Sequence, residues 1–536
     1  MVTTTQTISG QGNDPQADLI ADDGLRRTGR FAGGLINDLK RRLPSYGDDF
    51  KQGVHTKVLG STLFLYFACL ANAIAFGALT GFLTDGQIGT TEMMVATAAG
   101  GICFALFSGQ PLTILGGTGP IVIFTALLYQ TTQDLDLAFL PVYSWVGIWS
   151  GLLLMVLAVT DASALMRFFT RFTDEIFAAL IAVIFIVEAI TDIAAGFGDP
   201  DTPYDAALLG LVLAIGTFVV ARTLQWFRNS PYLRWWVRDF LADFGPAISI
   251  LVMTIVAILM HEVPRNHAEV PEAFGTTTGR PWIVDMLSLP TWIWFACIVP
   301  AILAVVLLFL DQNITTRLVN GKHHKLKKGS GYHLDLFIVG LIVAVCSVFG
   351  LPWIVAATVH SLNHVRSLAT HRVVDNEGSL REEIVSVREN RMSPLLVHAL
   401  IGASLLFLPL VAQIPMSVLF GLFLFMGFAT LAGNELFERV RMWFMDPRLY
   451  PKSHHFVGKV PMKVVHAFTA IQVACLAALW VLKSSALGLL FPILIAMLVP
   501  IRRMLPKFFD REHLAALDEE EDPEVFEETG GGRLGP

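Results

Sequence analysis

The sequence predicts an all-α polytopic membrane protein with fourteen transmembrane segments, arranged as two inverted repeats of seven. Three observations predict this class. The chain of 536 residues is 54% hydrophobic and only 15% charged, whereas an average soluble chain is about 25% charged. Apolar runs long enough to cross a bilayer recur along it. Its lysines and arginines gather in alternate connecting loops, as the positive-inside rule expects.

Twelve apolar runs approach or reach the length of a spanning helix, which needs about 17 to 25 residues. They fall into two series of six, separated by a more polar stretch. The first series is 58–80, 90–107, 137–160, 172–193, 205–222 and 244–261, and the second is 291–318, 333–349, 394–411, 416–433, 464–482 and 485–500.

Two further apolar segments, 110–130 and 351–369, are broken by glycine and proline. In the first, Pro111 and the glycines that follow forbid a continuous helix, and Pro352 does so in the second. Each segment should therefore be an extended piece followed by a short helix. Each is the third of seven elements in its half. Because each half has an odd number of membrane-crossing elements, the two halves have opposite orientations in the membrane. Such paired interruptions indicate a transporter's binding site, although they also permit close helix packing.

The loop charges orient this map. From a cytoplasmic N-terminus, 35 of the 38 lysines and arginines lie on the cytoplasmic side. No cleavable signal peptide is expected, because the N-terminal residues are polar. We predict a multi-pass protein of the plasma (cell inner) membrane with both termini cytoplasmic. Its parts are an N-terminal tail (1–57), a first repeat (58–262), an extracellular loop (263–290), a second repeat (291–500) and an acidic C-terminal tail (501–536).

Asp311 and Thr315 are the candidate ion ligands. An ionisable group inside a span is costly and is a functional hypothesis by default. The spacing of four places this carboxylate and this hydroxyl on one helix face. Oxygen ligands of this kind suit sodium, supplemented by backbone carbonyls. The alternative is a carboxylate satisfied by neighbouring groups alone.

The starts of the two short helices are the candidate anion site. Their free N–H groups carry partial positive charge, which suits a small anion. His360 either adds a titratable charge near neutral pH or simply forms a hydrogen bond. The candidate substrate-binding residues are Gly117, Thr118, Gly119, Ala357, Thr358, Val359 and His360.

Other chemistries lack support. The phosphate-binding GxxxxGK[ST] loop, HExxH and GxSxG are absent from the sequence, so we expect neither an enzyme nor a cofactor. The five cysteines lie in apolar runs without paired spacing. The basic cluster 322–328 is expected to contact membrane lipid rather than nucleic acid. Glu188 is either structural or part of an outer vestibule.

Several long motifs carry a resemblance to a known family. They include FSGQPLTILGGTGPIVIF (107–124), LDQNITTRLVNGKHHKLKKGSGYHLDLF (310–337) and LPWIVAATVHSLNHVRSL (351–368), within matches that keep their order over about 55–510. Through them the sequence closely resembles the bicarbonate transporters of solute carrier family 4, the band 3-like anion transporters.

The resemblance implies a core domain (58–160 and 291–411) and a gate domain (172–261 and 416–500). It also implies a homodimer that forms through the gate domains, and an elevator-like movement of the core. The family's substrate pocket lies between segments 3, 8 and 10. In this sequence those segments contain Thr118, Asp311, Thr315 and Thr358.

The family's branches differ at the positions of Asp311 and His360. Sodium-independent chloride/bicarbonate exchangers carry Glu at the position of Asp311, whereas sodium-coupled members carry Asp followed by the Thr, as here. His360 matches neither branch, because exchangers have Arg there and sodium-coupled members an aliphatic residue. We therefore expect cotransport of sodium with bicarbonate or carbonate. The alternatives are sodium-independent anion exchange, borate export and a non-transporting scaffold or receptor.

Overall fold

The structure is a computed structural model that describes residues 23–200, 202–264, 271, 274–376, 379–451, 454, 456–485 and 487–519. The predicted acidic C-terminal tail (501–536) is therefore described only to residue 519. The first 22 residues of the predicted N-terminal tail and part of the predicted extracellular loop lie outside the described residues.

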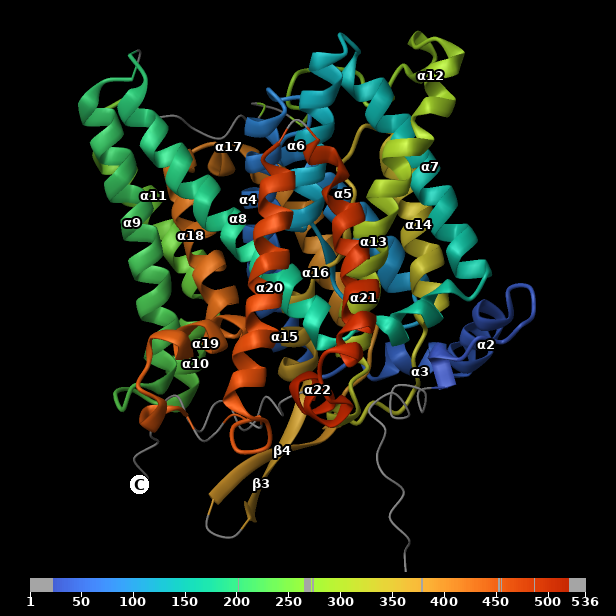
Figure 1. Ribbon diagram of the computed structural model, residues 1–536. Coiled ribbons are helices and arrows are strands. Elements are labelled where there is room, and N and C mark those ends of the chain that lie inside the picture. Colours follow the sequence, from blue (N-terminus) through green and yellow to red (C-terminus); the bar gives the residue numbers. More distant parts are fainter. Residues whose placement is uncertain are drawn as a thin grey trace, which may run out of the picture.

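Long helices make up the first half of the bundle (Figure 1). They are α4 (Thr56–Leu83), α5 (Thr90–Phe107), α6 (Gly119–Asp134), α7 (Phe139–Val159), α8 (Arg171–Gly198), α9 (Tyr204–Trp226) and α11 (Gly245–Leu259). A short strand, β1 (Leu115–Gly116), immediately precedes α6.

The second half repeats this pattern. Its helices are α12 (Thr291–Ala296), α13 (Ile298–Val319), α14 (Tyr332–Val348), α15 (Thr358–Leu368), α16 (Met392–Ser404), α17 (Leu408–Val411), α18 (Met416–Ala432), α20 (Met462–Lys483) and α21 (Phe491–Met504). The strand β2 (Val355–Ala356) precedes α15 just as β1 precedes α6. Both predicted interruptions therefore correspond to an extended piece followed by a helix.

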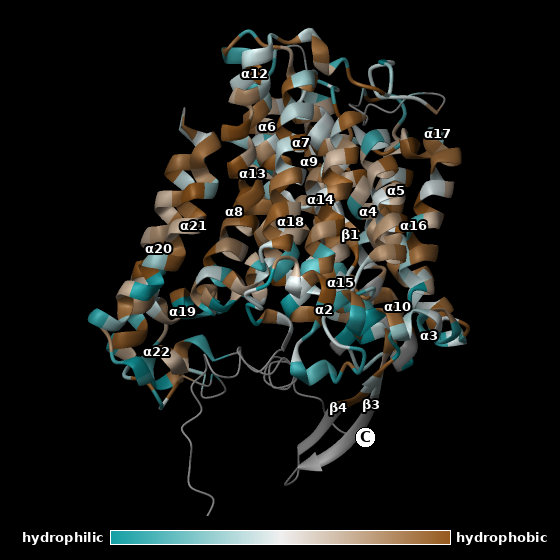
Figure 2. Cartoon of the chain, turned by 90° about the vertical axis from the view of Figure 1, so that its right-hand side faces the viewer, coloured by the Kyte–Doolittle hydropathy of each residue, from teal (hydrophilic) through white to brown (hydrophobic). Residues whose placement is uncertain are grey.

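Smaller elements gather at one end of the bundle. They are the helices α2 (Gly33–Arg42), α3 (Tyr46–Lys51), α10 (Trp235–Asp243), α19 (Glu435–Arg441) and α22 (Arg511–Asp518), and the antiparallel strands β3 (Ala369–Asn376) and β4 (Ser379–Val387). Figure 2 shows hydrophilic residues concentrated at this end and hydrophobic residues along the long helices. The loop charges predict that this end is cytoplasmic.

The predicted fold class, a mostly helical polytopic membrane protein, is confirmed. Among the described residues, nine helices are long and apolar enough to cross a membrane, or ten if the pair Met416–Ala432 and Glu435–Phe444, bent by 77°, is one span. Two shorter apolar helices, α11 and α14, add to them. The count of fourteen crossings stays a prediction.

Two predicted spans contain a local break caused by proline. The span 394–411 is divided into α16 and α17 by a 3-10 turn at Leu405–Phe407, and the span 291–318 is divided at Cys297. A proline ring clashes with the carbonyl four residues before it. Pro409 stands four residues after Leu405, the C-cap of α16, and Pro300 stands four residues after Ala296, the last residue of α12.

Small residues let the two halves approach closely. A Cβ added at Gly151 on α7 would lie 2.5 Å from the carbonyl oxygen of Gly340 on α14. Backbones this close require glycine, as is common between membrane helices. Beside this contact, Trp353 stacks on Tyr143 of α7 with ring centroids 4.4 Å apart. This packing fixes the chain just before β2.

Away from the contact between α7 and α14, Glu188 forms a 2.6 Å ion pair with Lys483, and this pair joins α8 to α20. This ion pair supports the structural interpretation of Glu188, and an outer vestibule there stays a prediction. The described cysteines are all free thiols that pack in or beside apolar surroundings.

Candidate functional site

The two interrupted elements meet through their strands. β1 and β2 pair antiparallel, with Leu115 opposite Ala356 and Gly116 opposite Val355. The amide of Ala357 extends the ladder by donating to the carbonyl of Ile114 at 2.8 Å. Two segments that lie far apart in the sequence thus begin their helices, α6 and α15, from one shared ladder.

Each helix start presents backbone amides that precede its first internal hydrogen bond. Internal bonding begins at Val122 in α6, which donates to Thr118, and at Ser361 in α15, which donates to Ala357. The earlier amides have no partner within the helix and carry partial positive charge. In α15 these are the amides of Thr358, Val359 and His360.

Two details modify the predicted anion site. The amide of Ala357 is used by the ladder, so Ala357 does not supply a free donor. Pro120 in the first turn of α6 has no N–H, so α6 offers only the amides of Gly119 and Ile121 there. The richer set of donors therefore belongs to α15.

Helix α13 supplies a side chain to each start. The hydroxyl of Thr118 donates to the Oδ2 atom of Asp311 at 2.7 Å. One helical turn later, the Oγ1 atoms of Thr315 and Thr358 lie 2.6 Å apart and share a hydrogen bond. Asp311 is only 8% exposed and Thr315 is buried. The structure thus brings together the four residues that the sequence nominated from three separate segments.

Two positioning residues were missed by the sequence argument. Gln312 is fully buried, and its Oε1 atom accepts the amide of Ala356 at 3.1 Å. Asn72 on α4 donates from Nδ2 to the carbonyl of Gly117 at 3.2 Å. Both hold the backbone beside a helix start. The signal that could have found them is a polar amide inside an apolar span, which lipid tolerates only when it has a partner.

His360 lies in the first turn of α15 but does not join the α13 group. Its Nε2 atom is 3.3 Å from the carbonyl of Ala68 on α4. His364, one turn later, contacts the carbonyl of Leu112 at 2.8 Å and the hydroxyl of Ser393 at 2.6 Å. His364 is therefore held at both ring nitrogens, whereas the single contact of His360 is long.

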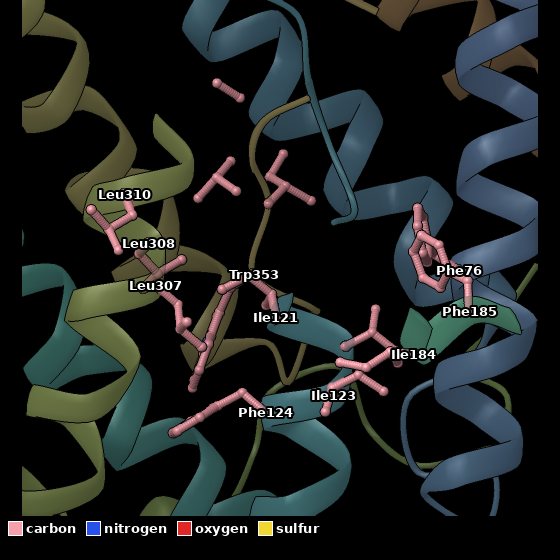
Figure 3. Packing of buried hydrophobic residues seen from close by; sticks show 14 of the residues in the cluster. Phe76, Ile121, Ile123, Phe124, Ile184, Phe185, Leu307, Leu308, Leu310 and Trp353 are labelled. Carbon is pink, nitrogen blue, oxygen red and sulfur yellow. The ribbon is translucent and has the colours of Figure 1, made fainter. Parts of the chain in front are cut away.

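An aromatic cluster adjoins the start of α6. Phe76 of α4, Phe185 of α8 and Phe423 of α18 have ring centroids 5.7 to 5.9 Å apart. A Cβ added at Gly119 would lie 2.6 Å from Phe185, so the glycine lets α6 approach this cluster. Figure 3 shows Phe76 and Phe185 side by side, near Ile123 of α6. The site therefore lies where α6 meets α8.

The polar groups at this site can hold a small cation or anion. In the described part of the chain, no group of three or more His, Cys, Asp or Glu residues is placed to bind a metal ion. What the arrangement offers is one carboxylate, two hydroxyls and several free amides. Oxygen ligands suit a small cation, and free amides suit a small anion.

Comparison with known proteins identifies a family. A family model described as the HCO3− transporter integral membrane domain matches residues 30–202 and 197–522. The chain is 38% identical to the mouse band 3 anion transport protein over 533 residues and 37% identical to mouse anion exchange protein 3 over 548 residues. Each alignment includes 95% of this chain. This chain spans 57% of the length of the first relative and 44% of the length of the second.

Solved structures share the fold at low sequence identity. One is the transmembrane domain of a cyanobacterial bicarbonate transporter, BicA, with a TM-score of 0.57 at 16% identity, covering 82% of this chain and 97% of that one. Another is the murine solute carrier 26 family member A9 in an inward-facing state, with a TM-score of 0.58 at 12% identity, covering 94% of this chain and 77% of that one. At such identities the likeness supports the fold alone.

Proposed function

The chain belongs to the family of HCO3− transporter integral membrane domains, and from that premise we propose that it is a secondary active transporter of bicarbonate or carbonate, coupled to sodium. The family is one of transporters, not enzymes. The transported ions are substrates, and the mechanism needs no resident cofactor.

One observation carries the proposal: a single helix, α13, contacts both helix starts through Asp311 and Thr315. The free amides of α6 and α15 attract an anion. An ionised Asp311 beside them would repel that anion. Sodium bound by the oxygens of Asp311 and Thr315 cancels this charge, so the cation recruits the anion. This mutual dependence is what couples the two fluxes.

The transport step follows from where the site lies. Asp311, Thr118 and Thr358 all belong to the proposed core domain (58–160 and 291–411), whereas Phe185 belongs to the proposed gate domain (172–261 and 416–500). An elevator-like displacement of the core past the gate would carry the site from one face of the membrane to the other. We place the gate domains at a homodimer interface in the plasma membrane, with both termini in the cytoplasm.

Sodium-independent anion exchange is the second candidate. It is favoured by the names of the relatives, band 3 anion transport protein and anion exchange protein 3. Chemically, a proton on Asp311 would cancel the same charge that sodium cancels. In that case the site would bind an anion without a cation, and a counter-anion would drive the return step.

The experiment that separates the two candidates uses purified protein in liposomes containing a pH-sensitive dye. Bicarbonate-dependent alkalinisation is measured with and without an imposed sodium gradient, and then with a chloride gradient. Flux that requires sodium supports cotransport. Flux that ignores sodium and follows chloride assigns the protein to the exchangers, and no flux under any gradient rejects both.

A further inference from the structure

Arg317 connects the site-bearing helix to a different part of the molecule. It lies on α13, two residues beyond Thr315. Its guanidinium forms an ion pair with Asp174 on α8, and its Nη1 atom donates to the carbonyl of Phe169 at 3.0 Å. The Arg317 and Asp174 side chains are 11% and 22% exposed. The contact is therefore largely shielded from water, which strengthens it relative to a surface pair.

The α8 side of this contact is firmly held. Glu175, the next residue on α8, forms an ion pair with Arg439, and Arg439 also pairs with Glu435 at 2.9 Å. The amide of Phe172 donates to a carboxylate oxygen of Asp518 on α22 at 3.3 Å. These contacts join the start of α8 to α19 and α22, so Asp174 sits on a rigid part of the proposed gate domain.

The α13 side is held equally well. Within two turns of Arg317, Thr315 is bonded to Thr358, and Gln312 is bonded to the amide of Ala356. Arg317 is thus fixed to the same helix that orders both helix starts. A displacement of α13 relative to α8 would have to break the Arg317–Asp174 pair.

The pair is chemically unlike its surroundings. Among the ion pairs between described residues, the Arg317–Asp174 pair is the one that joins the proposed core domain (58–160 and 291–411) to the proposed gate domain (172–261 and 416–500). Phe76 against Phe185 is an apolar contact between the same two domains. Apolar surfaces can slide with little change in energy, because their attraction is not directional. An ion pair with defined geometry selects one relative position.

We propose that Arg317 is a positioning residue that, through Asp174, holds the site-bearing helix against the gate domain in one state of the transport cycle. This inference rests on the proposed function, because it requires the two domains to move. The pair stabilises the state in which it is formed and must open before the site reaches the other face. It therefore sets the balance between the two states rather than the chemistry of ion binding.

The first test does not depend on flux. In the Asp174→Cys/Arg317→Cys double variant, a short thiol-reactive bifunctional linker should join the two positions and shift the mobility of the protein on a gel. Each single variant serves as the control for the five native cysteines. Efficient linking that leaves flux unchanged would overturn the proposal. Linking that stops flux, with flux restored by reduction, supports it.

The second test measures the apparent KM for bicarbonate on each face of oriented proteoliposomes. In Arg317→Gln and Asp174→Asn, we expect the two KM values to move in opposite directions by about two- to fivefold, because a shift in population favours one face at the expense of the other. Arg317→Asp/Asp174→Arg should return both values toward wild type. Equal changes on both faces would indicate a merely structural role and overturn the proposal.

The matched control is Arg441→Gln. Arg441 is 65% exposed and pairs with Glu438 on the same helix, α19, at 2.9 Å. The Arg441→Gln variant removes the same kind of charge at the same end of the bundle, but from an ion pair that does not join two domains. Both KM values should therefore stay at the wild-type values. If the wild-type protein shows no flux, the proposed function fails, and the linking test still reports whether the two positions touch.

Discussion

The starts of α6 and α15 have the same architecture but different chemistry. Both follow a two-residue strand of one shared ladder, and both receive a side chain from α13. α6 meets an acid, Asp311, and then continues through buried apolar residues. α15 meets a neutral hydroxyl, Thr315, and carries His360 and His364 within its first two turns.

The two repeats therefore contribute different groups to one site. The first start has few free amides, because Pro120 has none, and it bonds to the carboxylate. The second start has three consecutive free amides and no acid bonded to it. We therefore expect the cation to depend mainly on the α6 side and the anion mainly on the α15 side. Substitutions on either side of α13 can break this division.

The largest effect is expected at the acid. Asp311→Asn removes the charge that sodium would balance but keeps an oxygen that can accept from Thr118. We expect sodium-dependent bicarbonate uptake to fall by at least about a hundredfold, because a cation site without its one anionic ligand loses most of its affinity. Uptake by folded protein in liposomes is the measurement. Asp85→Asn, an exposed outer residue bonded to Tyr129, is the control, and equal uptake by the two variants would reject the division.

A smaller effect is expected at the hydroxyl pair. Thr315→Val and Thr358→Val each delete one partner of the 2.6 Å hydrogen bond. Each should reduce uptake by about five- to tenfold, since a buried hydroxyl left alone costs about 1 kcal/mol or more. The double variant should be no worse than either single variant, because the contact is shared. Strict additivity of the two effects would show that the hydroxyls act separately.

The next effect, on the pH dependence of bicarbonate affinity, is expected from His360 at the start of α15. If the charge of His360 contributes to anion affinity, then His360→Gln should flatten the pH dependence of the bicarbonate KM in the range in which histidine titrates, after correction for carbonate speciation. The expected change at pH 6 is about twofold. Identical pH profiles in variant and wild type would leave His360 a hydrogen-bonding residue only.

The smallest effect on flux is expected at the support of α14, the helix that leads into β2. The Asp38 carboxylate accepts the amides of His333 and Leu334 at 2.8 and 3.2 Å. Burial raises the pKa of Asp38 to about 7, although these amides and Arg41 oppose the rise. Between the ordinary pKa of 3.8 and the raised pKa of about 7, Asp38 keeps its proton in the folded protein and loses it in the unfolded chain. The free energy of unfolding therefore falls as pH rises through this range.

Asp38→Asn should remove this loss while keeping both accepted hydrogen bonds. We expect the variant to match wild type near pH 4 and to have the higher Tm at pH 8, with flux at neutral pH nearly unchanged. Thermal unfolding followed by fluorescence at the two pH values is the measurement. A parallel decline of Tm in both proteins would show that Asp38 is not the group responsible.

Much of this comparison could be predicted from the sequence. Glycine and proline act locally, so the interruptions before α6 and α15 were predictable from residues such as Pro111 and Pro352. The four-residue spacing of Asp311 and Thr315 placed both on one face of α13. The resemblance to a known family then indicated that Thr118 and Thr358 approach that face, and the structure contains both contacts.

What could not be predicted depends on partners distant in the sequence. The register of the β1–β2 ladder decides that the amide of Ala357 is bonded to Ile114, and no local pattern sets that register. Gln312 looks like an unexplained polar residue until Ala356 lies beside it. The pairing of Arg317 with Asp174 requires knowing how α13 and α8 pack. The β3–β4 hairpin lies between the predicted apolar segments 351–369 and 394–411, where the hydropathy pattern predicts no element.

The most direct test of the central claim is the uptake of radioactive sodium into proteoliposomes, with and without bicarbonate, by wild type and by Asp311→Asn. If Asp311 couples the two ions, bicarbonate stimulates sodium uptake by wild type, and this uptake is lost in the variant. Wild-type protein that moves bicarbonate but shows no bicarbonate-stimulated sodium uptake would contradict this coupling.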